Sequence, residues 1–240
     1  MDEQWVNKWL EILGLSLNKA GDLFKPFEPS RDFYDALLSG EDHDLEVGAE
    51  HVGRHLGLAA VPSAAYEWGL KMKPEVAGQI KLADDRRNAI QIPLSSIGKP
   101  YFLGAILAHE LTHDLLYCSG ITCPNLEELE RLTDLAAIAV GLGKLILNGI
   151  ITELLPGTGQ AVTLGYLSPD LTAYAFKVVN KRHLVSDADA RKNLAAEALK
   201  MLDIHSLQTR TEERRDVENK KKRITKSFSG FFKRGKKRHV

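Results

Sequence analysis

Apolar residues recur every three to four positions along most of this chain, which is the spacing of amphipathic helices. In residues 1–19, for example, Trp5, Trp9, Ile12 and Leu13 fall roughly on one face of a helix. The same spacing predicts further helices over residues 30–38, 45–56, 100–117, 125–147, 168–182 and 186–202.

Capping residues support several of these helix starts. Ser30, Asn125 and Ser168 each stand at a predicted N-cap, where a side-chain oxygen accepts a hydrogen bond from the first turn. Pro169 then occupies the first helical position, which tolerates proline because its N–H would have no partner there. Residues 149–165, rich in glycine, predict a loop between the helices at 125–147 and 168–182.

One short region alternates with a period of two instead. Polar and apolar residues alternate over 79–83 and again over 89–94, with a turn at 84–88 between them. This pattern predicts a β-hairpin directly before the helix at 100–117. Pro93 favours an edge position for the second strand, because proline cannot donate to a strand ladder. Such an edge strand is a place where an extended peptide can dock, although it can also serve only to pack on the helix.

Composition indicates one soluble domain with an extension. The chain has 240 residues, of which 44% are hydrophobic and 27% charged, and its formal net charge is zero. We expect an α+β, mostly helical domain over residues 1–205, with a helical part at 1–60 and a catalytic core at 77–185. Residues 206–240 are strongly basic and predict a charged helix that leads into a disordered tail.

The amino terminus and the longest apolar run suggest a cytoplasmic protein. The amino terminus carries acidic residues where a signal peptide needs basic ones. The longest apolar run, 135–147, is too short and too interrupted to span a bilayer. Cys118 and Cys123 are too few for a disulfide scaffold and do not have the C-x-x-C spacing of a zinc clip, so we interpret them as reduced thiols rather than a redox switch.

The helix at 100–117 contains the pattern H-E-x-x-H, formed by His109, Glu110 and His113. Histidines four residues apart project from the same helical face and can share one metal ion. The glutamate beside them is placed to act as a general base towards a metal-bound water. His51 and His55 are also four residues apart, but no acid completes a motif there, so we interpret them as a surface or half-buried pair.

A catalytic zinc needs a third protein ligand and an open position. The following helix offers Glu130, with Glu127 one turn away as the alternative. Asp134 lies four residues beyond Glu130 on the same face, where it can accept the free N–H of a ligating histidine. The two helices together therefore predict a zinc site between them.

His109-Glu110-Leu111-Thr112-His113 followed by Glu130-Arg131-Leu132-Thr133-Asp134 resembles the motif pair of gluzincin metallopeptidases. The resemblance covers about 101–147. It implies a zincin-like domain that binds one Zn²⁺ through His109, His113 and Glu130, with Glu110 as catalytic base and Asp134 as the partner of a ligating histidine.

The resemblance also implies hydrolysis of peptide or protein amide bonds. The tetrahedral oxyanion of that reaction needs a further hydrogen-bond donor. Tyr166, Tyr174 and His183 are the candidates, and Tyr174 is our choice because its helix is expected to pack near the preceding loop.

The basic tail, with Phe228, Phe231 and Phe232 between its lysines and arginines, can contact an anionic membrane surface or nucleic acid, or be only solvated. The alternative to a peptidase is a non-catalytic zinc-containing module with a protein-interaction or regulatory role. An intact Glu110 favours the enzyme, because a structural zinc site does not need that carboxylate.

Overall fold

The computed structural model describes residues 3–17, 25–67, 79–81, 89–154, 161–163 and 165–206. The chain forms two units, residues 1–199 and 200–240. The basic tail with its three phenylalanines, the hairpin turn at 84–88 and the glycine-rich residues 156–159 lie outside the described residues. The described part is mostly helical with a small sheet, which confirms the α+β class.

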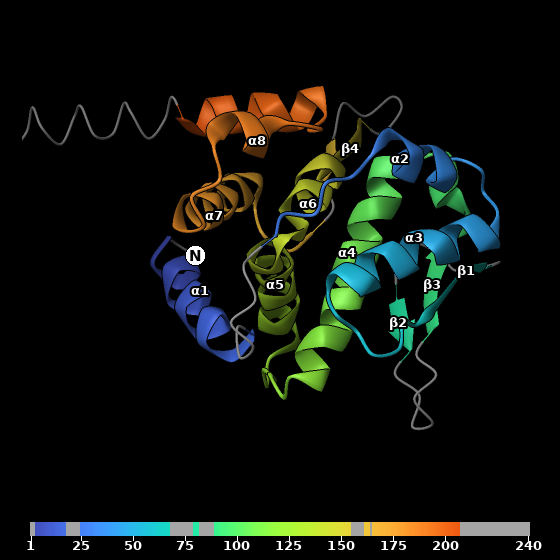
Figure 1. Ribbon diagram of the computed structural model, residues 1–240, viewed down its shortest axis with the longest axis horizontal. Coiled ribbons are helices and arrows are strands. Elements are labelled where there is room, and N and C mark those ends of the chain that lie inside the picture. The colour runs from blue at the N-terminus through green and yellow to red at the C-terminus, as the bar shows by residue number, and fades with distance from the viewer. Residues whose placement is uncertain are drawn as a thin grey trace, which may run out of the picture. The chain divides into compact units, whose positions relative to one another are not determined.

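Three helices form the first part of the fold (Figure 1). Helix α1, Glu3–Leu17, buries Val6, Leu10 and Leu13. Helix α2, Arg31–Leu37, begins as predicted at Ser30, whose hydroxyl accepts a hydrogen bond from the N–H of Phe33 at 3.1 Å. Helix α3, Asp42–His55, lies across the later helix α4 and also contacts the sheet.

The sheet has three strands in the order β1-β3-β2: β1 is Ser63–Glu67, β2 is Gln79–Lys81 and β3 is Ala89–Pro93. Strands β2 and β3 pair antiparallel, which confirms the hairpin. The prediction that β3 is an edge strand is wrong, because β1 pairs with it in parallel and makes it the central strand. Pro93 is tolerated because it is the last residue of its strand, opposite the last residue of β1.

Helix α4, Pro100–Cys118, is the core helix of the domain. It packs against α2, α3 and two later helices, α5 and α6 (Figure 1). Twelve of its 19 residues are buried, including the acids Glu110 and Asp114. A helix buried on nearly all sides explains why this segment is apolar almost all round, and it makes the buried carboxylates conspicuous.

The predicted single helix over 125–147 is wrong. Helix α5, Leu126–Ala137, passes into a π-helical turn, Ile138–Leu142, and then into α6, Gly143–Gly149. Gly141 has φ +98°, and a Cβ at this position would stand 2.5 Å from the carbonyl oxygen of Lys25. The N–H of Phe27 donates to the Gly141 carbonyl at 2.9 Å. The helix is therefore interrupted at Gly141, where the segment with Lys25 and Phe27 comes close to it.

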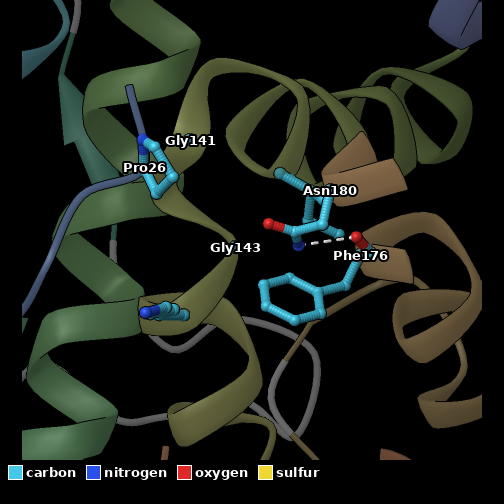
Figure 2. Close-up of a pocket in the computed structure, with 7 residues that line it drawn as sticks. Pro26, Gly141, Gly143, Phe176 and Asn180 are labelled. Atoms are coloured by element: carbon cyan, nitrogen blue, oxygen red, sulfur yellow. Dashed lines mark hydrogen bonds between the residues drawn. The ribbon is translucent and has the colours of Figure 1, made fainter. Parts of the chain in front are cut away.

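The small pocket beside this break is lined by Pro26, Gly141, Gly143, Phe176 and Asn180 among others (Figure 2). The ring of Phe176 packs so closely on Gly143 that a Cβ there would stand 2.7 Å from it. This close packing holds helix α7, Pro169–Arg182, against the π-helical turn.

The remainder of the first unit contains two short strands and two labelled helices. Strands β4, Ile151–Leu154, and β5, Ala161–Thr163, pair antiparallel where only a loop was predicted. Helix α7, Pro169–Arg182, begins at Ser168 as predicted. Helix α8 spans only Asp187–Arg191, so the predicted helix over 186–202 is wrong; Asn193, at φ +62°, lies before a separate helical stretch at 196–206.

The span Leu126–Gly149 is long and apolar enough to cross a membrane by length and composition. However, 89% of its most apolar window is buried inside the fold, as in the core helix of a soluble protein.

Candidate metal centre

Helices α4 and α5 bring three side-chain donor atoms to one point. The Nε2 atoms of His109 and His113 lie 3.0 Å apart. Oε2 of Glu130 lies 2.9 Å from the first nitrogen and 3.0 Å from the second. Histidine at i and i+4 of α4 supplies two donors, and the packing of α5 on α4 supplies the third. These three residues form a group that can hold a metal ion.

The other ring nitrogen of each histidine is already engaged. Nδ1 of His109 lies 2.8 Å from Oδ1 of Asp134 and donates to that carboxylate. The hydroxyl of Thr133 donates to the carbonyl of Leu129 at 2.9 Å, so it accepts from Nδ1 of His113 at 3.2 Å. In the neutral rings both Nε2 atoms therefore present lone pairs towards each other and towards the Glu130 carboxylate.

Three acceptors at 3 Å repel one another unless a cation lies among them. Burial by itself lowers the pKa of His109, but hydrogen bonds to Asp134 and Glu130 together raise that pKa well above its ordinary value. Burial likewise raises the pKa of Glu130, and its hydrogen bonds with both histidines lower it to about 2. The site therefore favours positive charge, and in the absence of a metal these hydrogen bonds favour the protonated form of His109.

The metal group is only partly enclosed. The side chains of His109, His113 and Glu130 are 12%, 15% and 17% exposed, so solvent reaches the cluster without surrounding it. Structural zinc sites have a closed set of four protein ligands. This group has three protein donors and is partly accessible to solvent.

The two competing acids of α5 take separate roles. Glu127 accepts a hydrogen bond from Arg131 at 2.6 Å, and its side chain is 66% exposed, so Glu130 rather than Glu127 completes the group. Glu110 is 6% exposed on α4 directly beside His109, and its charge contributes to the raised pKa of that histidine.

The three candidates for oxyanion donor lie in different surroundings. The hydroxyl of Tyr174, our choice from the sequence, accepts a hydrogen bond from Asn7 of α1 at 2.7 Å. His183 caps the end of α7, where burial and then the charge of Arg182 lower its pKa. Tyr166 is the candidate that the structure places on the cluster, with its ring stacked on His109 at 5.8 Å between centroids.

Sequence reasoning missed Thr133 and the backbone around Tyr166. Thr133 stands three residues after Glu130, a spacing that puts the two on neighbouring positions of one helix and that could have identified it. The part played by Tyr166 has no such local signal, since it comes from a separate segment of the chain.

The other histidine pair is not a metal site in the described residues. Nε2 of His55 donates to the carbonyl of Val140 at 3.1 Å, and its ring packs edge-on against Phe27. Cys118 and Cys123 are both free thiols.

No family model, curated protein or solved structure matches this chain. A function for this chain therefore has to be inferred from the chemistry of the site.

Proposed function

We propose that this chain is a zinc-dependent metallopeptidase of gluzincin type, with a zincin-like domain, that hydrolyses peptide or protein amide bonds in the cytoplasm. The observation that carries the proposal is the convergence of His109, His113 and Glu130, with a second acid, Glu110, buried beside them. Two imidazoles and one carboxylate with access to solvent are the ligand set of catalytic zinc.

The spacing of the donors supports this metal. Donor atoms around tetrahedral zinc, with bonds of about 2.0–2.1 Å, lie about 3.3 Å from one another. The three donors here lie 2.9–3.0 Å apart, so a small outward adjustment of each side chain suffices. When bound, zinc supplies Lewis acidity, which lowers the pKa of a water and polarises a substrate carbonyl.

The side chains of this chain then divide the remaining work. Glu110 accepts the proton of the attacking water and passes it to the leaving amine. Asp134 keeps the proton of His109 on Nδ1 and so keeps Nε2 available as a ligand atom. Thr133 does the same for His113 through its hydroxyl oxygen.

The second candidate is a non-catalytic zinc module that binds a protein partner. The partial burial of the group gives this candidate some support, because a shielded metal can serve stability alone. The two candidates differ in what they require of Glu110, because only the peptidase needs its carboxylate as a base.

The deciding experiment is an unbiased peptide-library digest, read by mass spectrometry, with the full chain loaded with zinc. The Glu110→Gln variant keeps the size of the side chain but cannot accept the proton, so cleavage should fall by at least about a hundredfold. Glu127→Gln, which alters an exposed acid of α5, is the matched control and should cleave like the wild type.

Equal metal content in all three proteins is required for the comparison. If wild type and Glu110→Gln contain zinc and give the same peptides, the peptidase proposal fails and the non-catalytic module stands.

A further inference from the structure

Asp134 joins the metal group to a distant segment of the chain. Its Oδ1 accepts from Nδ1 of His109 at 2.8 Å, while its Oδ2 accepts from the backbone N–H of Tyr166 at 2.6 Å and of Leu167 at 3.1 Å. The carboxylate is buried at 2% exposure, and these three donors account for both of its oxygens. One side chain therefore fixes both a ligand and the segment 165–167.

Gly165 allows this close approach. Its φ is +100°, a conformation that side-chain-bearing residues rarely adopt, and a Cβ there would stand 3.0 Å from Oδ2 of Asp134. The next two residues can therefore direct their N–H groups at the same oxygen. On the other side, Ser168 caps helix α7 immediately after Leu167, so the segment is anchored at its carboxyl end as well.

Tyr166 also contacts His109, one of the proposed metal ligands, directly. Its ring lies on the imidazole of His109 with 5.8 Å between centroids and an angle of 25° between the ring planes. His109 is thus held in its plane by Asp134 at one edge and covered on one face by Tyr166. Both contacts restrict rotation of the imidazole, and so the direction in which its Nε2 lone pair points.

We propose that residues 165–167 are a positioning segment for the metal, in which Tyr166 holds the ring of His109 and Gly165 allows the segment to reach Asp134. This inference depends on the proposed metal centre, and it adds a role that neither the H-E-x-x-H motif nor the second helix provides. Tyr166 acts through His109, so it is a positioning residue.

The test measures binding of Zn²⁺ alone to the full chain by competition with a coloured chelator. Tyr166→Leu removes the ring, and Tyr166→Phe retains it. Outer contacts of metal ligands are typically worth 10–100-fold in affinity. We expect about a tenfold loss for Tyr166→Leu and about a twofold change or less for Tyr166→Phe. Tyr117→Leu, at a tyrosine of α4 that is 65% exposed, is the control and should bind like wild type.

The absorption spectrum of the Co²⁺-loaded protein provides a second measurement, because it reports ligand geometry directly. It should change in Tyr166→Leu and be retained in Tyr166→Phe. Wild-type affinity and an unchanged cobalt spectrum in Tyr166→Leu would overturn the positioning role while leaving the metal centre intact. Failure of the wild type to bind metal would instead refute the metal centre.

A variant that leaves the ring in place guards against misfolding of Tyr166→Leu. Gly165→Ala should weaken zinc binding by about tenfold, because the segment must retreat from Asp134. In the wild type, Zn²⁺ should also slow hydrogen exchange of the Tyr166 and Leu167 amides. Wild-type affinity in Gly165→Ala together with unchanged exchange at these amides would overturn the inference.

Discussion

The imidazole rings of His109 and His113 meet edge to face, with their Nε2 atoms 3.0 Å apart. Two neutral imidazoles at this distance, each with its proton directed away to Asp134 or Thr133, have no hydrogen bond to share. The adjacent Glu130 carboxylate adds a third acceptor. The arrangement is stabilised only by a cation, which is why the group should bind a metal ion.

Replacing Asp134 with Asn should weaken metal binding more than loss of a single charge suggests. The carboxylate accepts three N–H bonds through two oxygens, whereas an amide has one oxygen and a donor nitrogen. Whichever way the new amide is turned, its NH2 group faces at least one of these N–H donors. We expect about a 10–100-fold loss of zinc affinity, measured by chelator competition. Asp32→Asn, at an exposed acid of α2, is the control. An equal loss of zinc affinity in this variant would show that the contacts of Asp134 do not support metal binding.

Metal affinity should rise with pH. In the metal-free protein the raised pKa of His109 keeps this ring protonated at neutral pH, so the metal must displace that proton. Affinity should therefore increase by up to about tenfold per pH unit until the pH exceeds the pKa of His109 in the folded protein. Glu130, with a pKa of about 2, is ionised throughout and contributes no slope. Calorimetry in two buffers of different ionisation enthalpy measures the released proton, and zinc affinity that is constant between pH 6 and 8 would contradict the expectation.

Gly141→Ala should destabilise the protein. The residue has φ +98°, and the new methyl group would stand 2.5 Å from the Lys25 carbonyl oxygen. Together the strained backbone and the collision should lower the free energy of unfolding by about 2–4 kcal/mol, measured by urea denaturation. Gly14→Ala is the matched control: nothing lies within 4 Å of its Cβ position inside helix α1, so it should stabilise by about 0.5–1 kcal/mol. Equal effects at the two positions would show that the break at Gly141 is not constrained.

The ion pair between the buried ammonium of Lys144 and the exposed carboxylate of Glu28 should respond asymmetrically to substitution. The ammonium of Lys144, only 2% exposed, donates to both carboxylate oxygens of Glu28 at 2.6 and 2.8 Å and to the carbonyl of Asp189 at 2.6 Å. Glu28→Ala leaves a buried charge without its counter-ion, whereas Lys144→Met removes that charge and keeps the volume. Urea denaturation should show the larger loss for Glu28→Ala; the reverse order would mean that Lys144 is readily hydrated.

The sequence predicted those features whose signals are local. The caps at Ser30, Asn125 and Ser168 were found because each needs only a side chain and the first turn after it. The metal group was found because His109 and His113 share a helix, and Glu130 and Asp134 share the next one.

Features that depend on tertiary contact were missed. Residues 63–67 have no strong alternation, so the parallel partner that makes β3 central was not predicted. The apolar pattern continues through Gly141, and only the approach of Lys25 and Phe27 marks the break. Tyr166 reaches His109 from a separate segment, and no spacing along the chain predicts that contact.

The most direct test of the metal centre is a crystal structure of the zinc-loaded protein, with anomalous scattering recorded on both sides of the zinc absorption edge. The account predicts one anomalous peak bonded to Nε2 of His109, Nε2 of His113 and a carboxylate oxygen of Glu130, with no fourth protein ligand. A zinc-loaded crystal with no peak among these three residues, or with four protein ligands around the ion, would contradict it.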